Sequence, residues 1–296
     1  MMNKGMITGF ALIGVMLMSI FASSAFGADI ELSEDSTLEG ILKRGKLRIG
    51  LEVGYMPFEM LDKRGGLRQR TVRHGGVRRG GQQLNIIGFD IDMGREMAKE
   101  LGVQFVPVDT VWPSIIPALN VGRFDIIMGG MSVTEVRKLK VDFADPFMTI
   151  GQTVLLNKKH RGKVTSYKDL NAPEFIVTSK PGTTGEEAVM KFIPECTYKP
   201  FGTETAGADE VLNGNADAFV YDLPFNAVFT AMHGTGKLVF LDKPFTTEPI
   251  AWAIRKDDPD FLNWLNKFLK EIKADGRFEK LYDKWFRNTD WFRHVR

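Results

Sequence analysis

The chain has 296 residues, of which 44% are hydrophobic, and its formal net charge is +2. Its single cysteine, Cys196, excludes an internal disulfide and a cysteine-based metal cluster, and its four histidines lack the spacing of metal ligands. Seven Lys and Arg residues lie between residues 63 and 81, where there is no acid, so the net charge of the rest of the chain is −5 (+2 minus 7). This mildly acidic remainder predicts no nucleic-acid partner. We also expect no metal and no cofactor.

The first residues predict a secretory signal peptide over residues 1–27. Lys4 precedes an uncharged apolar stretch over residues 6–21, and the small residues Ala25 and Gly27 indicate cleavage before Ala28. An uncleaved anchor is the alternative, but the stretch is shorter than the ~20 apolar residues that span a bilayer. Export without disulfides is typical of the bacterial periplasm, where we expect the protein to reside.

Short β-branched runs then alternate with amphipathic segments, the pattern of a mainly parallel α/β fold. The first series has strands at 46–51, 103–108 and 124–128, with helices at 89–101 and 112–121. The second series has strands at 152–157, 175–178, 198–201, 216–221 and 238–241, with helices at 184–192, 204–212 and 224–233. A strand at 251–255 and helices at 259–274 and 277–285 complete the chain. We predict two α/β units.

The Arg/Gly-rich segment at residues 63–84 interrupts what is otherwise a short hairpin between Asp62 and Asn85. Its low hydrophobicity and high charge predict a mobile surface loop. Contact with anionic lipid or nucleic acid is the alternative to a neutral insertion, which we favour.

Two charged residues stand out as candidate ligand groups. Arg137 closes the segment 130–137, in which Thr134 is placed to cap a helix, and Asp222 follows the apolar run 216–221. Together they offer a cation for a carboxylate and an anion for an ammonium group, as a zwitterion requires. The alternatives are an exposed arginine in a charged turn and an aspartate that caps the helix beginning near Pro224.

Further candidates surround this pair in the sequence. Ser132 offers a hydroxyl, and Gly130 lets the backbone approach a ligand closely. Thr183 and Thr184 open a helix after a strand, so either can cap it or grip an anion. Aromatic walls around a ligand are expected from Tyr55 and Trp112, although aromatic residues are more often core.

Several of these segments, in this order, resemble the bacterial extracellular solute-binding proteins of family 3, the periplasmic receptors of polar amino-acid ABC importers. The resemblance rests on residues 88–101, 112–119, 124–137, 182–184 and 217–222. It implies an α/β clamshell, the type II periplasmic-binding-protein fold, with two crossover hinge strands near residues 147–152 and 245–250. The first lobe would be discontinuous, over 40–147 plus 250–288, with the 63–84 loop inserted in it; the second would cover 152–245.

The resemblance also implies roles and partners. Glu52 would lie near the side chain of a cationic or amide-bearing ligand, with a surface glutamate as the alternative. Arg137 would hold the carboxylate and Asp222 the ammonium of a free polar amino acid, and the protein would act as a monomer that delivers its ligand to membrane permease subunits. An alternative of the same fold is a periplasmic cyclohexadienyl dehydratase acting on prephenate or arogenate, for which Glu52 or Glu248 would be the acid. A sensor module is a third possibility.

Overall fold

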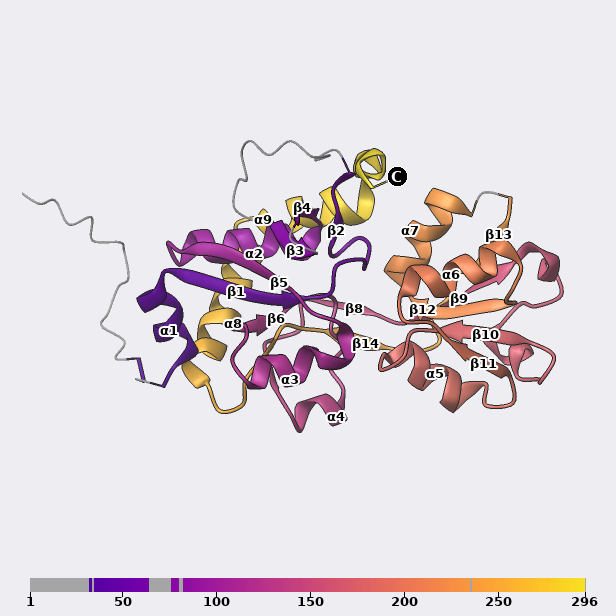
Figure 1. The fold of residues 1–296 in the computed structure, drawn as a ribbon, viewed down its shortest axis with the longest axis horizontal. Helices are drawn as coiled ribbons and strands as arrows, with labels where there is room; N and C mark the ends of the chain where they lie inside the picture. Colours follow the sequence, from indigo (N-terminus) through magenta and orange to yellow (C-terminus); the bar gives the residue numbers. More distant parts are fainter. Residues whose placement is uncertain (1–31, 34, 64–75, 80–81, 235, 296) are drawn as a thin grey trace, which may run out of the picture. The chain divides into compact units, whose positions relative to one another are not determined.

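The computed structural model describes residues 32, 33, 35–63, 76–79, 82–234 and 236–295. The predicted signal peptide and much of the Arg/Gly-rich segment lie outside these residues. From residue 32 onward the chain forms one compact unit. It contains two five-stranded sheets, each with its own helices, which confirms the expected α/β class (Figure 1).

The first sheet has the strand order β5-β1-β6-β15-β7. Its strands are β1 (Lys46–Leu51), β5 (Gln104–Asp109), β6 (Ile126–Ile127), β7 (Asp142–Phe143) and β15 (Ala253–Ile254). β1 pairs in parallel with β5 and β6, whereas β15 runs antiparallel between β6 and β7. The first lobe therefore takes a strand from late in the chain.

The second sheet has the order β11-β10-β12-β9-β13. Its strands are β9 (Gln152–Asn157), β10 (Ile176–Ser179), β11 (Thr197–Pro200), β12 (Ala218–Asp222) and β13 (Leu238–Leu241). β10 pairs in parallel with β11 and β12, and β9 is antiparallel to β12 and β13. The carboxyl end of β12 places Asp222 at the sheet edge where α/β proteins bind ligands.

Most helices follow the predicted segments closely, whereas α1 (Thr37–Arg44) was not predicted. The α-helices are α1 (Thr37–Arg44), α2 (Phe89–Glu100), α3 (Ile115–Asn120), α4 (Glu135–Lys138), α5 (Thr184–Phe192), α6 (Glu204–Asn213), α7 (Leu223–His233), α8 (Pro259–Ala274) and α9 (Arg277–Tyr282). Shorter turns are η2 (Trp112–Ser114), η3 (Lys158–His160), η4 (Tyr167–Leu170), η5 (Asp283–Arg287, a π-helix) and η6 (Asp290–His294). None of the helices in the described part is long and apolar enough to cross a membrane.

Two helices differ from the prediction at their ends. The segment predicted as one helix over 112–121 begins as the 3₁₀ turn η2 and becomes α-helical only at Ile115. Pro117 has no N–H to donate to the carbonyl of Pro113, so the first turn lacks an α-helical bond there. The last predicted helix, 277–285, is α-helical to Tyr282 and then continues as η5.

Two strands lie where the crossovers were expected. β8 (Met148–Ile150) pairs antiparallel with β14 (Glu248–Ile250), and their labels lie between the two sheets in Figure 1. An isolated bridge joins Ser132 to Ile250. Glu248 is thereby brought beside the pocket described below, while the lobe limits given above stay a prediction.

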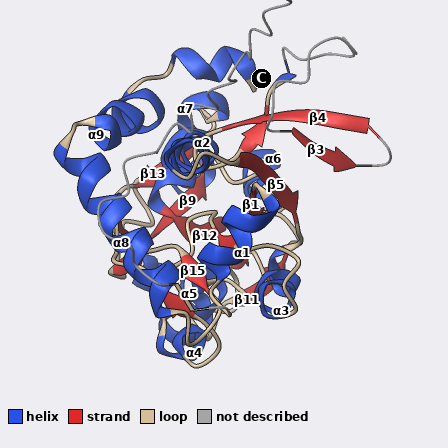
Figure 2. Cartoon of the chain, turned by 90° about the vertical axis from the view of Figure 1, so that its left-hand side faces the viewer, coloured by secondary structure: helices blue, strands red, loops and turns tan. Residues whose placement is uncertain are grey.

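The Arg/Gly-rich segment is not loop throughout, contrary to the prediction. β3 (Gly76–Arg79) pairs antiparallel with β4 (Gln82–Ile87), which also pairs with β2 (Met60–Leu61). Figure 2 shows β3 and β4 as two neighbouring strands. Backbone pairing holds such a ribbon together even where the sequence lacks an apolar pattern. Residues 64–75, 80 and 81 lie outside the described part.

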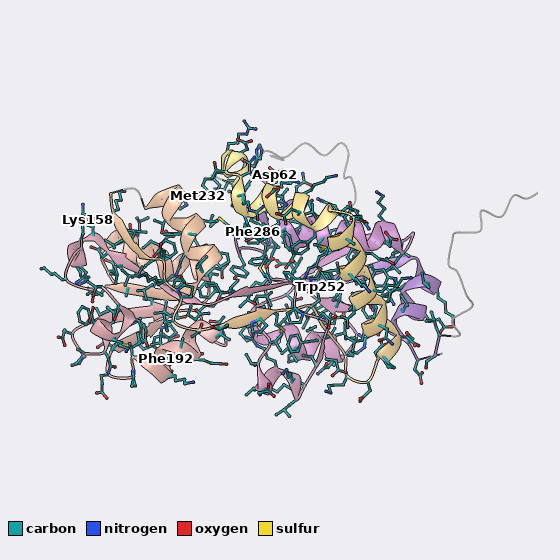
Figure 3. All side chains as sticks on the ribbon, turned by 180° about the vertical axis from the view of Figure 1, so that it is seen from behind. Asp62, Lys158, Phe192, Met232, Trp252 and Phe286 are labelled. Carbon is teal, nitrogen blue, oxygen red and sulfur yellow. The ribbon has the colours of Figure 1, made fainter. Side chains whose placement is uncertain are left out.

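Aromatic side chains fill the core of the first lobe next to the crossover strand β8. Trp252 is 1% exposed and lies in the interior of this lobe (Figure 3). Its ring stacks on Phe147 with centroids 5.3 Å apart, and Phe268 of α8 lies 6.1 Å from it. Trp252, between β14 and β15, thus packs against Phe147, which directly precedes β8. This contact fixes both crossover strands, β8 and β14, to the first lobe.

Candidate functional site

One pocket contains all nine candidate site residues. It is lined by Glu52, Tyr55, Glu59, Trp112, Gly129, Gly130, Ser132, Arg137, Lys180, Thr183, Thr184, Tyr221 and Asp222. Its free volume is only ≈ 20 Å³, about the space that one water molecule needs. A ligand of amino-acid size therefore does not fit unless the lobes or the lining side chains move.

Arg137 is 8% exposed, so the exposed arginine considered from the sequence is wrong. The Thr134 hydroxyl caps α4 by accepting from the Arg137 amide at 3.2 Å, as predicted. The guanidinium donates to the carbonyl of Ser132 at 2.9 Å and lies 5.3 Å from the centre of the Trp112 ring. Burial lowers the pKa of Arg137, and the charges of Glu187 and Asp222 oppose this. A desolvated guanidinium in a pocket is well placed for a carboxylate.

Asp222 is 6% exposed. It occupies the N-cap position of α7, yet its side chain makes no capping hydrogen bond within the described residues, so the helix-cap alternative is wrong. Its carboxylate accepts from the Tyr55 hydroxyl and from Gln152 Nε2, the latter at 2.5 Å. Burial, followed by the charge of Glu248, raises the pKa of Asp222 to about 7.

A hydrogen-bonded network links Asp222 to the crossover. Glu248 on β14 accepts from the Ser132 hydroxyl at 2.7 Å and from Gln152 Nε2 at 3.0 Å. Gln152 Nε2 also lies 3.2 Å from Thr184 Oγ1. Ser132 belongs to the first lobe and Gln152 to the second, so both lobes and a hinge strand share this network. From the sequence, Glu248 was a candidate only for the enzymatic alternative.

Thr183 and Thr184 both line the pocket, but neither caps α5 through its side chain within the described residues. Thr183 is at the N-cap position, and its hydroxyl donates to the Lys180 carbonyl at 2.7 Å instead. The expectation of a threonine cap is therefore wrong. The Thr184 hydroxyl faces Ser132 Oγ at 3.4 Å, which brings two hydroxyl groups from different lobes together.

The two aromatic candidates both make contacts across the lobes. Trp112 Nε1 donates to the Gly182 carbonyl at 2.9 Å, and the Tyr55 hydroxyl reaches Asp222. The Tyr55 ring stacks on Phe58, which is fully buried, with centroids 4.8 Å apart. Tyr55 and Trp112 thus form walls of the pocket, and Phe58 is a core residue that supports one of them.

The glycine pair at 129–130 depends on an acid that the sequence analysis interpreted only as a helix-start residue. Asp90 Oδ2 accepts from the amides of Gly129 and Gly130 at 2.5 and 3.3 Å. Gly130 has φ +63°, and a Cβ there would lie 2.4 Å from Tyr55 Cε1. The backbone can therefore pass this close to the Tyr55 ring only at a residue without a side chain.

Lys180, Glu59 and Glu204 were missed by the sequence analysis. Lys180 is 4% exposed, and its ammonium group lies between Glu204, at 2.8 Å, and Glu52. Glu52 is thus part of the pocket and not a free surface residue. Burial and the charge of Asp90 raise the pKa of Glu59 well above its ordinary value. Nothing in the local sequence distinguishes Lys180 from a surface lysine, because both of its partners are distant in the chain.

Comparison with known proteins gives consistent results. The profile of the family described as bacterial extracellular solute-binding proteins, family 3, matches residues 78–288. A probable histidine-binding protein of Neisseria gonorrhoeae is 31% identical over 242 residues, which cover 81% of this chain and 82% of the relative.

Two solved structures are more similar in sequence. A protein from Wolinella succinogenes, described as a binding component of an ABC transporter and complexed with lysine, is 46% identical, with a TM-score of 0.76 over 84% of this chain and 99% of the other. An ancestral amino acid-binding protein, described as a precursor of cyclohexadienyl dehydratase, is 43% identical, with a TM-score of 0.75 over 85% of this chain and 100% of the other.

Proposed function

Because the chain belongs to family 3 of the bacterial extracellular solute-binding proteins, we propose that it is a periplasmic receptor for a polar amino acid. The observation that carries this proposal is the meeting of Arg137 and Asp222, from different lobes, in one pocket. The relatives described above support it, since they are described as proteins that bind amino acids. Membrane subunits of an ABC importer would be the partners to which the loaded receptor, as a monomer, delivers its ligand.

Recognition of the amino-acid backbone uses both lobes. Arg137 grips the carboxylate with two parallel hydrogen bonds, and the ammonium group donates to Asp222 in place of the Tyr55 hydroxyl. When the lobes are apart, a ligand can contact either Arg137 or Asp222, but only the closed arrangement lets it contact both. Ligand therefore shifts the hinge equilibrium toward closure through its higher affinity for that form.

The hinge consists of β8 and β14, and the lobes on either side comprise residues 40–147 plus 250–288 and 152–245. Glu248 supports this assignment because it contacts Ser132 and Gln152 from a crossover strand. A signal peptide over residues 1–27, removed before Ala28, would deliver the receptor to the periplasm. The importer then receives a ligand that was captured outside the cytoplasm.

Titration calorimetry of the chain from Ala28 onward tests the proposal, after a thermal-shift screen against the common amino acids selects a ligand. Arg137→Ala should cost about 2–5 kcal/mol of binding free energy, because the ligand carboxylate loses its buried partner. Lys138→Ala is the matched control, since Lys138 is next in sequence but its side chain is half exposed and pairs with Glu135. Unchanged affinity in Arg137→Ala would refute the site assignment.

A dehydratase is the second candidate. It is favoured by the raised pKa of Asp222, about 7, in a closed pocket, because an acid that remains protonated near neutral pH can protonate a leaving hydroxyl group. We propose that the protein is not an enzyme, because Asp222 is needed as the partner of an ammonium group. Incubation with prephenate separates the two candidates: formation of phenylpyruvate would establish turnover, and its absence together with amino-acid binding supports the receptor.

A further inference from the structure

Arg137 and Asp222 account for the ligand's backbone but leave a second group of charges in the pocket unexplained. Glu52, Glu59 and Lys180 line the same cavity, and Glu204 holds Lys180 from outside its lining. Three carboxyl groups therefore surround one ammonium group. This part of the pocket has an excess of negative charge that a zwitterion's backbone does not neutralise.

The Lys180 ammonium group is already paired with two carboxylates. It lies between Glu52 of the first lobe and Glu204 of the second, and the side chain of each of the three is at most 14% exposed. An acidic ligand side chain would have to compete with both of these carboxylates for Lys180. The pairing of Lys180 therefore disfavours an acidic ligand. It also leaves Glu59 without a cation in direct contact within the described part of the chain.

Glu59 is the group that lacks a partner. It is 1% exposed, and among the described residues no group donates a hydrogen bond to its Oε2. Its charged neighbours are Asp90, Glu204 and Glu52, with Lys180 as the opposing cation, and Tyr55 lies close enough to sense its charge. A buried acceptor without a donor is costly, and a charged donor on a ligand would remove that cost.

Resting on the proposed function, we infer that the bound amino acid has a cationic side chain, whose ammonium or guanidinium group donates to Glu59 while Lys180 stays between Glu52 and Glu204. Binding of such a side chain ionises Glu59. A ligand of the same shape without the charge leaves Glu59 protonated, so the cationic ligand releases an additional proton on binding.

Calorimetry with matched ligand pairs tests the inference. L-lysine is compared with L-norleucine, which lacks only the ε-ammonium group, and L-arginine with the neutral L-citrulline. The cation of at least one pair should bind about 10–100-fold more tightly than its neutral counterpart, as a charge-assisted hydrogen bond allows. Glu59→Gln should remove most of this difference and leave the neutral ligand within about threefold, whereas Glu195→Gln, an exposed residue of the second lobe, should change neither.

The outcomes are distinguishable. If no amino acid binds, the proposed function fails and the inference with it; if neutral ligands bind as tightly as cations, or Glu59→Gln weakens both equally, the inference alone is overturned. Should Glu59→Gln not fold, the unchanged protein still provides a test. Titration in two buffers of different ionisation enthalpy counts the protons released, and equal numbers for lysine and norleucine would contradict a role for Glu59, because any release from Asp222 is common to both.

Discussion

Replacing Asp222 with asparagine should make the ligand-free protein more stable while it destroys amino-acid binding. Burial and the charge of Glu248 raise the pKa of Asp222 from 3.8 to about 7. A pKa that is higher by about 3 in the folded chain corresponds to about 4 kcal/mol of unfolding free energy. Because the folded-state pKa is the raised one, this stability is present at low pH and is lost as pH rises from about 4 to about 7. Asparagine does not ionise and escapes the loss.

Urea unfolding of ligand-free protein at pH 4 and pH 8 measures the effect. Asp222→Asn should differ little from the unchanged protein at pH 4 and should be more stable at pH 8, by up to about 4 kcal/mol. Asp90, whose pKa is also raised to about 7, is present in both proteins, so its contribution cancels in the difference. An equal difference in unfolding free energy at the two pH values would refute this account of Asp222.

Two further substitutions test the pocket. Lys180→Met should lower the unfolding free energy by about 3–5 kcal/mol, since it leaves Glu52 and Glu204 buried without their cation. Urea unfolding measures this loss, and adding Glu204→Gln should recover part of it. If the double variant is no more stable than Lys180→Met, the ion pairs are not the cause of the loss. Gly130→Ala should cost about 1–2 kcal/mol from its φ of +63° alone, and its methyl group should displace the Tyr55 ring. Calorimetry should show weaker amino-acid binding, and a normal affinity would contradict the packing described.

The backbone-binding part of the pocket could be predicted because its residues stand at the ends of local elements. Arg137 is positioned by a cap three residues earlier, and Asp222 ends a buried strand. Such placements depend on hydrogen bonds and burial patterns within a few residues, which a sequence reveals directly. The same reasoning placed most helices and strands within a few residues of their observed limits.

The side-chain part of the pocket could not be predicted in this way. Lys180 precedes a proline and a glycine, as surface lysines before turns often do, yet its ammonium group is buried between Glu52, 128 positions earlier, and Glu204, 24 positions later. An acidic residue at position 90, in the first turn of α2, is already explained by the helix dipole. Nothing in the sequence therefore indicated that Asp90 also accepts hydrogen bonds from the amides of Gly129 and Gly130. These roles arise from tertiary contacts that have no signature in the neighbouring sequence.

The order of strands in the two sheets also constrains how the chain folds. Every strand of the second sheet lies between residues 152 and 241, so this sheet can assemble from one continuous stretch. The first sheet starts earlier in the chain but places β15, residues 253–254, between β6 and β7. During synthesis from the amino terminus, the sheet that begins first is therefore completed last, because β15 joins β6 and β7 only after the whole second sheet has emerged.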